Sequence, residues 1–242
     1  MATRIAMWSG PRNISTAMMR SWENRPDCTV VDEPFYAAYL SATGLDHPMR
    51  AEILAAQSSE YAEVVRQISA VPVTSALQYQ KQMTHHIPRG MDMSWCKTLK
   101  HCFLIRDPAA VIASYAKKMP TVTEDAIGIT RQVELFEEIS EICGCEPVVI
   151  DSQDVLRNPL GILRQLCEAL QLHFPAEAML KWPTGRRNSD GAWAPHWYHN
   201  VEQSTGFGEY AATSPELREE YAVLARAMDP AYRQLWQRRL LP

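Results

Sequence analysis

RIAMWSGPRNISTAMMRSW, residues 4–22, decides the fold of this chain. An apolar run gives way to a short stretch containing Gly and Pro, and a helical pattern of apolar residues follows from Ile14. The pattern predicts a strand, a tight loop and a helix. The first turn of a helix attracts anions, and Arg12 adds a positive charge near Ser15 and Thr16. We therefore interpret this corner as a candidate phosphate site, although an ordinary strand-to-helix corner has the same pattern.

The loop differs from a Walker A motif. That motif, G-x-x-x-x-G-K-[ST], places a second glycine and a lysine just before the helix. This chain has Ile14 there, and its first lysine is Lys81. A phosphate at this corner would depend on Arg12 for its cation.

Length and composition indicate an ordinary globular protein. The 242 residues, 46% hydrophobic and 21% charged, can bury a large core, and we expect one domain over residues 1–242. The net charge of −4 favours no nucleic-acid or anionic-membrane partner. The start Met1-Ala2-Thr3 lacks the features of a signal peptide, and no apolar run reaches about 18 residues, so we expect a cytoplasmic protein.

The cysteines match no metal site. Cys143-Gly-Cys145 is a C-x-C pair without the spacing of a zinc ligand pair, and no second pair completes it. We expect free, mostly buried thiols and no bound metal. The six are Cys28, Cys96, Cys102, Cys143, Cys145 and Cys167.

Strand-like and helix-like stretches alternate along the chain. Strands are predicted near positions 4, 28, 76, 101 and 147. This alternation predicts an α/β fold with a mostly parallel central sheet of about five strands and helices on both faces. We further expect one long helix over 123–143 and a helix over 215–240. The irregular stretch 181–207, rich in Gly, Trp and His, is a candidate functional loop or lid.

Charged and imidazole side chains follow several predicted strands. Asp32 and Glu33 end the second strand, and Arg106 ends the fourth. The third predicted strand, over 76–79, is followed by a loop that carries Lys81, His85 and His86. Ligands of open α/β sheets bind at the carboxyl ends of strands, so these groups are candidates for a site. Each also has a structural interpretation, as a helix-terminal charge or a turn-locking pair.

Four stretches, in order, resemble the sulfotransferase family. These enzymes move a sulfuryl group from 3′-phosphoadenosine 5′-phosphosulfate (PAPS) to an acceptor. The stretches that carry the resemblance are Ser9-Gly10-Pro11-Arg12-Asn13-Ile14-Ser15-Thr16, Phe103-Leu104-Ile105-Arg106-Asp107-Pro108 with Ser114-Tyr115, Asp151 to Pro159, and Gly185-Arg186-Arg187 to Trp193.

The resemblance implies a P-loop-like sulfotransferase fold, of the kind found in soluble bacterial members, and a set of site residues. Residues 10–16 would form the 5′-phosphosulfate loop, with Arg12 also catalytic, and Arg106 and Ser114 would hold the 3′-phosphate. Arg186 and Arg187 would belong to a loop that closes over the nucleotide. A small-molecule acceptor is implied, and the aromatic residues of the 181–207 stretch favour an apolar or ring-bearing one, although such residues also pack lids.

Two departures from the family pattern matter. The first loop has Arg12 where many members have lysine, an exchange that suits phosphate oxygens but is not neutral. The catalytic base is open between two residues. Glu33 fits the glutamate that some members place after the second strand. His85 fits the histidine of a K-T-H-x-P stretch, although Thr84-His85-His86-Ile87-Pro88 is one residue longer.

Two other functions share this pattern. A kinase or NTPase would use the same strand, loop and helix, but it requires the P-loop lysine and an Mg²⁺-binding carboxylate, for which Asp32 and Asp151 are the candidates. A non-catalytic nucleotide-binding protein on the same fold is the other alternative.

Overall fold

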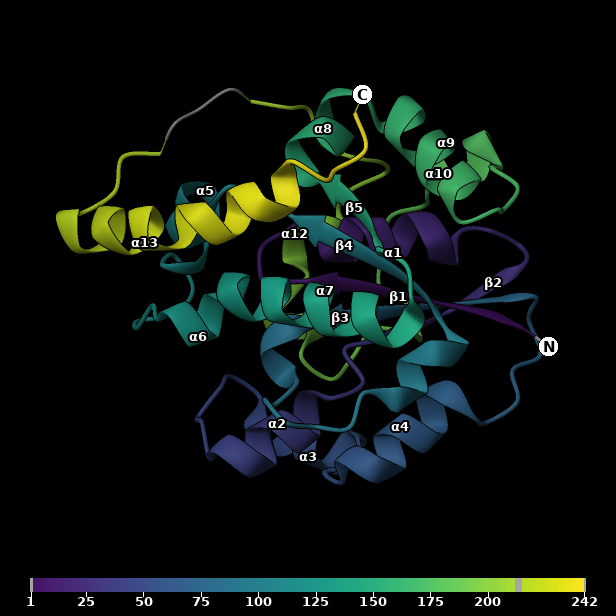
Figure 1. The fold of residues 1–242 in the computed structure, drawn as a ribbon, viewed down its shortest axis with the longest axis horizontal. Helices are drawn as coiled ribbons and strands as arrows, with labels where there is room; N and C mark the ends of the chain where they lie inside the picture. The colour runs from purple at the N-terminus through teal and green to yellow at the C-terminus, as the bar shows by residue number, and fades with distance from the viewer. Residues whose placement is uncertain (1, 212–214, 242) are drawn as a thin grey trace.

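A five-stranded parallel sheet forms the centre of the computed structural model, which describes residues 2–211 and 215–241 (Figure 1). The strand order is β2-β3-β1-β4-β5, and every neighbouring pair is parallel. The strands are β1 (Thr3–Ser9), β2 (Cys28–Asp32), β3 (Leu77–Met83), β4 (Lys100–Ile105) and β5 (Val148–Asp151). All five lie at the predicted positions, which confirms the α/β prediction.

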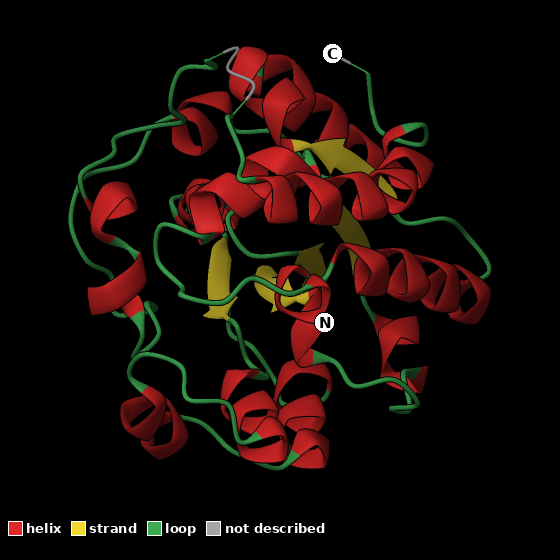
Figure 2. Ribbon diagram, turned by 90° about the vertical axis from the view of Figure 1, so that its left-hand side faces the viewer, coloured by secondary structure: helices red, strands yellow, loops and turns green. Residues whose placement is uncertain are grey.

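Helices follow each strand and enclose the sheet (Figure 2). The α-helices before β4 are α1 (Ser15–Glu23), α2 (Tyr36–Thr43), α3 (Arg50–Ala56) and α4 (Tyr61–Ser69). Two 3₁₀ helices, η1 (Thr84–His86) and η2 (Ser94–Thr98), separate β3 from β4. The later helices are α5 (Pro108–Tyr115), α6 (Glu124–Ile127), α7 (Ile129–Cys143), α8 (Ser152–Arg157), α9 (Pro159–Ala169), α10 (Ala176–Leu180), α11 (Ala194–Trp197), α12 (His199–Glu202) and α13 (Glu219–Trp236).

Both faces of the sheet are buried. Successive side chains of a strand point to opposite faces, and β1 shows this directly. Ile5 and Met7 pack with α1, α9 and α10, whereas Ala6 and Trp8 pack with α5, α7 and α13. An apolar residue at every position of β1 is therefore the expected pattern of a central parallel strand.

The carboxyl ends of the strands meet at one edge of the sheet. Ser9 at the end of β1 lies beside Met83 of β3 and Leu104 of β4. At the next strand, Asp32 of β2 lies beside Lys81 of β3. This register brings the loops after β1, β2, β3 and β4 together and so positions the candidate site.

Strand β3 corrects one sequence prediction. It extends to Met83, so Lys81 lies inside a strand and not in the loop that the sequence predicted. All seven side chains of β3 are buried, although Gln78, Gln80, Lys81 and Gln82 are polar. These buried polar groups bond to one another and to the backbone, as Gln80 does to Ile68 O over 2.6 Å. Apolar alternation, the sequence signal of a strand, is absent for this reason.

Two predicted helical stretches are interrupted. The stretch 123–143 divides into α6 and α7 at Gly128, which has a φ of 71°. A Cβ on Gly128 would lie 3.0 Å from Thr84 Oγ1 and 3.2 Å from His85 Cβ, so glycine allows this junction to approach η1. Residues 47–70, whose apolar positions recur at helical spacing and so predict a further helix, are likewise divided, into α3 and α4.

Backbone contacts fix two parts of the C-terminal region of the chain. Lys181 pairs with Gly206 in an antiparallel bridge, which brings the ends of the 181–207 segment together. Helix α13 packs against α5 and α7, and beyond it Leu240 N donates to Val149 O of the edge strand β5 over 2.8 Å. None of the helices in the described residues has the length and apolar character that a bilayer span requires.

Candidate active site

The loop after β1 has a constrained backbone. Arg12 and Ile14 have φ values of 62° and 55°, a left-handed conformation that costs non-glycine residues about 1–3 kcal/mol each. Between them, the buried side chain of Asn13 donates to Leu104 O over 3.0 Å and ties the loop to β4. The loop then enters α1 at Ser15, where unpaired backbone N–H groups face the loop. Strain of this kind is typical of ligand-binding loops.

Two arginines that are far apart in the sequence meet at this loop. Arg12 Nε donates to Ser114 Oγ of α5 over 2.9 Å, and Arg106 donates to the backbone oxygen of Arg12. Burial lowers the pKa of both guanidinium groups, and their mutual repulsion contributes for Arg12. Neither arginine forms an ion pair with a carboxylate within residues 2–211 and 215–241. The corner therefore holds two guanidinium groups that form no ion pair within the described residues, although Asp107 and Asp151 lie close enough to oppose the lowering of the Arg106 pKa, and an anion would find positive charge there.

A cavity of about 370 Å³ opens beside this corner. Most of the residues that the sequence analysis selected line it. They are Pro11, Arg12, Asn13, Ile14, Ser15, Thr16, Glu33, His85, His86, Arg106 and Ser114. Gly10 does not line the cavity. A Cβ on Gly10 would lie 2.6 Å from Ile127 O, so only glycine fits at this position.

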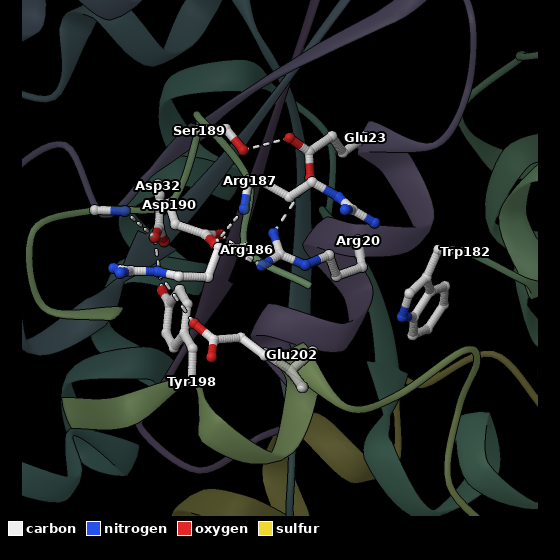
Figure 3. Close-up of polar contacts among 12 residues, drawn as sticks. Arg20, Glu23, Asp32, Trp182, Arg186, Arg187, Ser189, Asp190, Tyr198 and Glu202 are labelled. Atoms are coloured by element: carbon white, nitrogen blue, oxygen red, sulfur yellow. Dashed lines mark hydrogen bonds and ion pairs between the residues drawn. The ribbon is translucent and has the colours of Figure 1, made fainter. Parts of the chain in front are cut away.

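Arg186 and Arg187 lie away from the cavity lining. The Arg186 side chain is 60% exposed and pairs with Glu202 over 3.4 Å. Arg187 lies 3.8 Å from Glu23 of α1, and its backbone N–H donates to Asp190 over 2.8 Å (Figure 3).

A buried ion pair fixes the same part of the 181–207 segment on α1. Arg20 Nη2 lies 2.6 Å from Asp190 Oδ1, and the side chains are 1% and 2% exposed. In Figure 3, Arg20 and Glu23 point from α1 toward Ser189 and Asp190 of the segment. Ser189 also donates to Glu23. The segment is therefore anchored to α1, the helix that follows the loop after β1.

Lys81 was one of the charged groups named as candidates for a site, but the family resemblance gave it no role, and it is central to the opposite wall of the cavity. Its ammonium group donates to Asp32 Oδ1 over 3.1 Å, to Glu33 Oε1 over 2.7 Å and to Tyr198 OH over 2.6 Å. Burial alone would lower the pKa of Lys81, but Asp32 and Glu33 outweigh it and the pKa is raised. The sequence signal that could have identified Lys81 is the pair of adjacent carboxylates at the end of β2, because two buried carboxylates require a cation nearby.

The two neighbouring carboxylates have different surroundings. Asp32 Oδ2 accepts hydrogen bonds from Tyr198 OH over 2.6 Å and from Gly191 N over 3.1 Å, in addition to the contact of Oδ1 with Lys81. Among the described residues the Glu33 carboxylate accepts only from Lys81, at Oε1. Burial raises the pKa of Glu33, and Lys81 opposes this rise. Glu33 thus keeps an oxygen available at the cavity, whereas both oxygens of Asp32 are occupied.

Glu33 also has a strained backbone. Its φ of 39° lies in the left-handed region, which is uncommon for a residue other than glycine. The Glu33 backbone is held by a hydrogen bond from its N–H to Lys81 O over 3.0 Å and by one that its carbonyl accepts from Gln57 over 3.1 Å. These contacts maintain the conformation that turns the carboxylate toward the cavity.

The imidazoles of η1 are uncharged at neutral pH. Burial and the neighbouring His47 lower the pKa of His85 to about 3, and burial also holds the pKa of His86 far below its ordinary value. The ring of His86 stacks on Tyr36 with centroids 4.6 Å apart. Within the described part of the chain, Nδ1 of each of the two histidines lacks a hydrogen-bond partner.

The aromatic residues of the 181–207 segment separate into two groups. Trp193, Trp197 and Tyr198 line the cavity described above. Trp182 and Phe207 instead pack together, with centroids 5.2 Å apart, at a second hollow of about 1030 Å³. Only the first group is placed to contact a molecule bound near Arg12.

The cysteines agree with the sequence prediction. All six are free thiols, and four of them, Cys28, Cys96, Cys102 and Cys167, are buried. Over residues 2–211 and 215–241, no group of three or more His, Cys, Asp or Glu side chains is arranged to hold a metal ion.

A family model of the sulfotransferase domain matches residues 3–239. The chain belongs to this family. The match covers the loop after β1, both arginines, the Asp32–Lys81 cluster and the 181–207 segment, so the site described above lies entirely within it.

Two curated proteins of Arabidopsis thaliana are similar to the chain. Branched-chain-amino-acid aminotransferase-like protein 2 is 35% identical over 87% of this chain, and the like-named protein 1 is 36% identical over 94%. The chain spans only 38% and 40% of their lengths.

Solved sulfotransferase structures share the fold. A sulfotransferase domain from the curacin biosynthetic pathway matches with a TM-score of 0.53 at 14% identity, covering 100% of this chain and 99% of that one. A domain of the Synechococcus PCC 7002 olefin synthase matches at 0.55 and 17% identity, covering 94% and 95%. A sulfotransferase from Alicyclobacillus acidocaldarius matches at 0.56 and 11% identity, covering 100% and 98%.

Proposed function

We propose that this protein transfers a sulfuryl group from PAPS to a hydroxyl or amine of a small-molecule acceptor. One observation carries the proposal, the hydrogen bond of 2.9 Å between Arg12 and Ser114. It joins the two predicted anion-binding motifs into one positively charged corner. Membership in the sulfotransferase domain family supports the same activity.

The residues at this corner suit a donor that carries two separate phosphate groups. Arg106 and Ser114 would bind the 3′-phosphate, because a guanidinium and a hydroxyl both donate to phosphate oxygens. Arg12, the backbone N–H groups of the loop, and Thr16 would bind the 5′-phosphosulfate. The positive charge of Arg12 and Arg106 supports this assignment, because both side chains are half-buried and neither forms an ion pair with a carboxylate among the described residues.

The chemistry follows from where charge develops. Sulfuryl transfer, like phosphoryl transfer, requires an in-line approach of the acceptor and stabilisation of the departing oxygen. Arg12 and the N-terminus of α1 would stabilise that oxygen, because both contribute positive charge at the loop after β1. No covalent intermediate on the protein is required.

We assign Glu33 as the base that takes the acceptor's proton. Its carboxylate lines the cavity and keeps one oxygen without a partner among the described residues, and its pKa is raised toward neutrality by burial. His85 is a weaker base because its pKa is about 3. We assign His85 to the orientation of the acceptor, together with Trp193 and Tyr198.

Calorimetry with adenosine 3′,5′-bisphosphate, compared with Mg-ATP, tests the proposal against its alternatives. Micromolar binding of the bisphosphate without metal supports the sulfotransferase function. A preference for Mg-ATP would overturn it in favour of a kinase or NTPase. In the same cavity Lys81 already contacts two carboxylates, which argues against its use as a P-loop lysine. Bisphosphate binding without sulfation of any acceptor would favour a non-catalytic nucleotide-binding protein.

A further inference from the structure

Lys81 connects the base to the 181–207 segment through a single ammonium group. An ammonium group has three protons to donate, and all three are used, one each toward Asp32, Glu33 and Tyr198. Lys81 is 1% exposed, so water does not replace any of these contacts. Tyr198 comes from the 181–207 segment, whereas the other three groups come from β2, the residue after it, and β3.

Charge in this cluster is unbalanced. Two carboxylates share one ammonium group, so one negative charge remains in a buried place. Asp32 is already surrounded by three donors, which are Lys81, Tyr198 and the backbone N–H of Gly191. Glu33, with one donor, is therefore the carboxylate at which the cluster takes up a proton as pH falls.

The other titratable groups that face the cluster are neutral at pH 7. Burial raises the pKa of Tyr36 on α2, Tyr79 on β3 and Tyr198. Burial lowers the pKa of His86 on η1, which is also repelled by its neighbours His85, His47 and Lys81. Among the residues that the structure describes, Lys81 is the cation in contact with the Glu33 carboxylate, so it is the group placed to favour the ionised form.

We propose that Lys81 is a positioning residue that keeps Glu33 ionised, and that Tyr198 of the 181–207 segment strengthens this effect through its hydrogen bond to Asp32. The proposal rests on the assignment of Glu33 as base in the proposed function. Tyr198 and the backbone N–H of Gly191 donate to Asp32 and partly neutralise it, which leaves more of the Lys81 charge for Glu33. Without these donors, Asp32 would compete more strongly for Lys81.

Trp193 stabilises the hydrogen bonds of the Tyr198 hydroxyl. Its indole N–H donates to Tyr198 OH over 2.9 Å, so the hydroxyl accepts from Trp193 and Lys81 and donates to Asp32. The orientation of the Tyr198 proton is thereby fixed toward Asp32, as the proposal requires.

The decisive measurement is a carboxyl titration that does not depend on turnover. Protein labelled with ¹³C at glutamate δ-carbons is titrated by NMR, and the Glu33 signal is identified by its loss in Glu33→Gln. We expect Lys81→Met to move the Glu33 midpoint upward by about one to three pH units, because a buried carboxylate loses its cation. Tyr198→Phe should move the midpoint in the same direction by less. An unchanged midpoint in both variants would overturn the proposal.

The matched control is Lys97→Met, which removes an exposed lysine of η2 that lies outside the cavity lining. It should leave the Glu33 midpoint in place. Lys81→Met deletes a buried charge and could unfold the protein, so adenosine 3′,5′-bisphosphate binding, which depends on Arg12, Arg106 and Ser114, reports whether each variant is folded. Tyr198→Phe keeps the cation and tests the proposal even if Lys81→Met does not fold.

Rate measurements then separate this inference from the proposed function. If Glu33 is the base, the acid limb of the kcat/KM profile moves upward with the NMR midpoint in both variants. A merely structural role would lower kcat/KM equally at all pH values and would leave both the limb and the NMR midpoint in place, which would overturn the inference. If the midpoint moves while the limb of an active enzyme stays, Lys81 still controls Glu33, but the assignment of Glu33 as base fails.

Discussion

Arg12 Nε and Ser114 Oγ lie 2.9 Å apart, although 102 positions separate the two residues in the sequence. The contact exists because β1 and β4 are neighbours in the sheet, so that the loop after β1 meets the helix after β4. It places the two halves of the proposed donor site side by side.

Removal of the Arg12 side chain should abolish most turnover without unfolding the protein. Loss of one preorganised donor to a developing charge typically costs about 10²–10³ in rate, so we expect that reduction in kcat for Arg12→Ala. The measurement is sulfate transfer from PAPS, with circular dichroism to verify the fold. Arg66→Ala, which removes an exposed arginine of α4, is the control and should be fully active. Near-normal turnover by Arg12→Ala would exclude the proposed donor site.

Ser114→Ala should weaken recognition of the 3′-phosphate specifically. A hydrogen bond to a charged group contributes about 1.5–3 kcal/mol, so the affinity for adenosine 3′,5′-bisphosphate should fall by about tenfold or more. Affinity for adenosine 5′-phosphosulfate, which lacks the 3′-phosphate, should change little. Calorimetry with both nucleotides measures the difference. An equal loss for both would place Ser114 elsewhere than at the 3′-phosphate.

The free energy of unfolding should fall as the pH drops below about 6.5. Burial lowers the pKa of His85 to about 3 and that of His101 to about 4, and the pKa of His86 is lowered as well. At a pH between the pKa of an imidazole in the unfolded chain and its lower pKa in the folded protein, the unfolded chain binds a proton that the folded protein does not. Each of these histidines therefore lowers the free energy of unfolding by about 1.4 kcal/mol per pH unit over that range. The raised pKa values of Glu33 and Asp151 act in the opposite direction and reduce the net slope.

Urea unfolding at several pH values between 7.5 and 4.5 measures this slope. The clearest single contribution comes from His101, which accepts from Trp8 Nε1 at Nδ1 over 3.0 Å and faces Cys96 O at Nε2 over 2.9 Å. His101→Gln should reduce the slope, because glutamine does not titrate. His199→Gln, at an exposed position, serves as the control. A free energy of unfolding that does not change between pH 7 and pH 5 would contradict the conclusion that these histidines are neutral in the folded protein.

The ion pair between Arg20 and Asp190 should matter more for stability than any exposed pair. Both side chains are nearly inaccessible to solvent. Removal of one partner leaves a buried charge, so Asp190→Ala should lower the free energy of unfolding by about 3–5 kcal/mol, with Glu23 compensating in part. Chemical denaturation measures this. The exposed pair of Arg226 and Glu219 provides the control, and Glu219→Ala should cost less than about 1 kcal/mol. Equal effects of the two substitutions would show that the buried pair is not needed.

Local sequence patterns predicted the strands and helices wherever the usual signals apply. The five strand positions were found because four strands are rich in apolar or β-branched residues, as in Ile5 to Trp8. Strand β3 was found only in part because its Gln and Lys side chains are buried in polar contacts. The helix break at Gly128 was missed because its cause is the approach of His85, a contact between distant segments.

The sequence by itself determined the α/β fold and indicated the candidate anion-binding groups, Arg12, Arg106 and Ser114. Those features depend on periodicity and on short motifs, which are local. Only the tertiary structure decided which groups act together. The register of β2 against β3 places Lys81 beside Asp32, and docking of the 181–207 segment adds Tyr198. Pairing of buried charges follows from the packing of separate segments, which no local pattern contains.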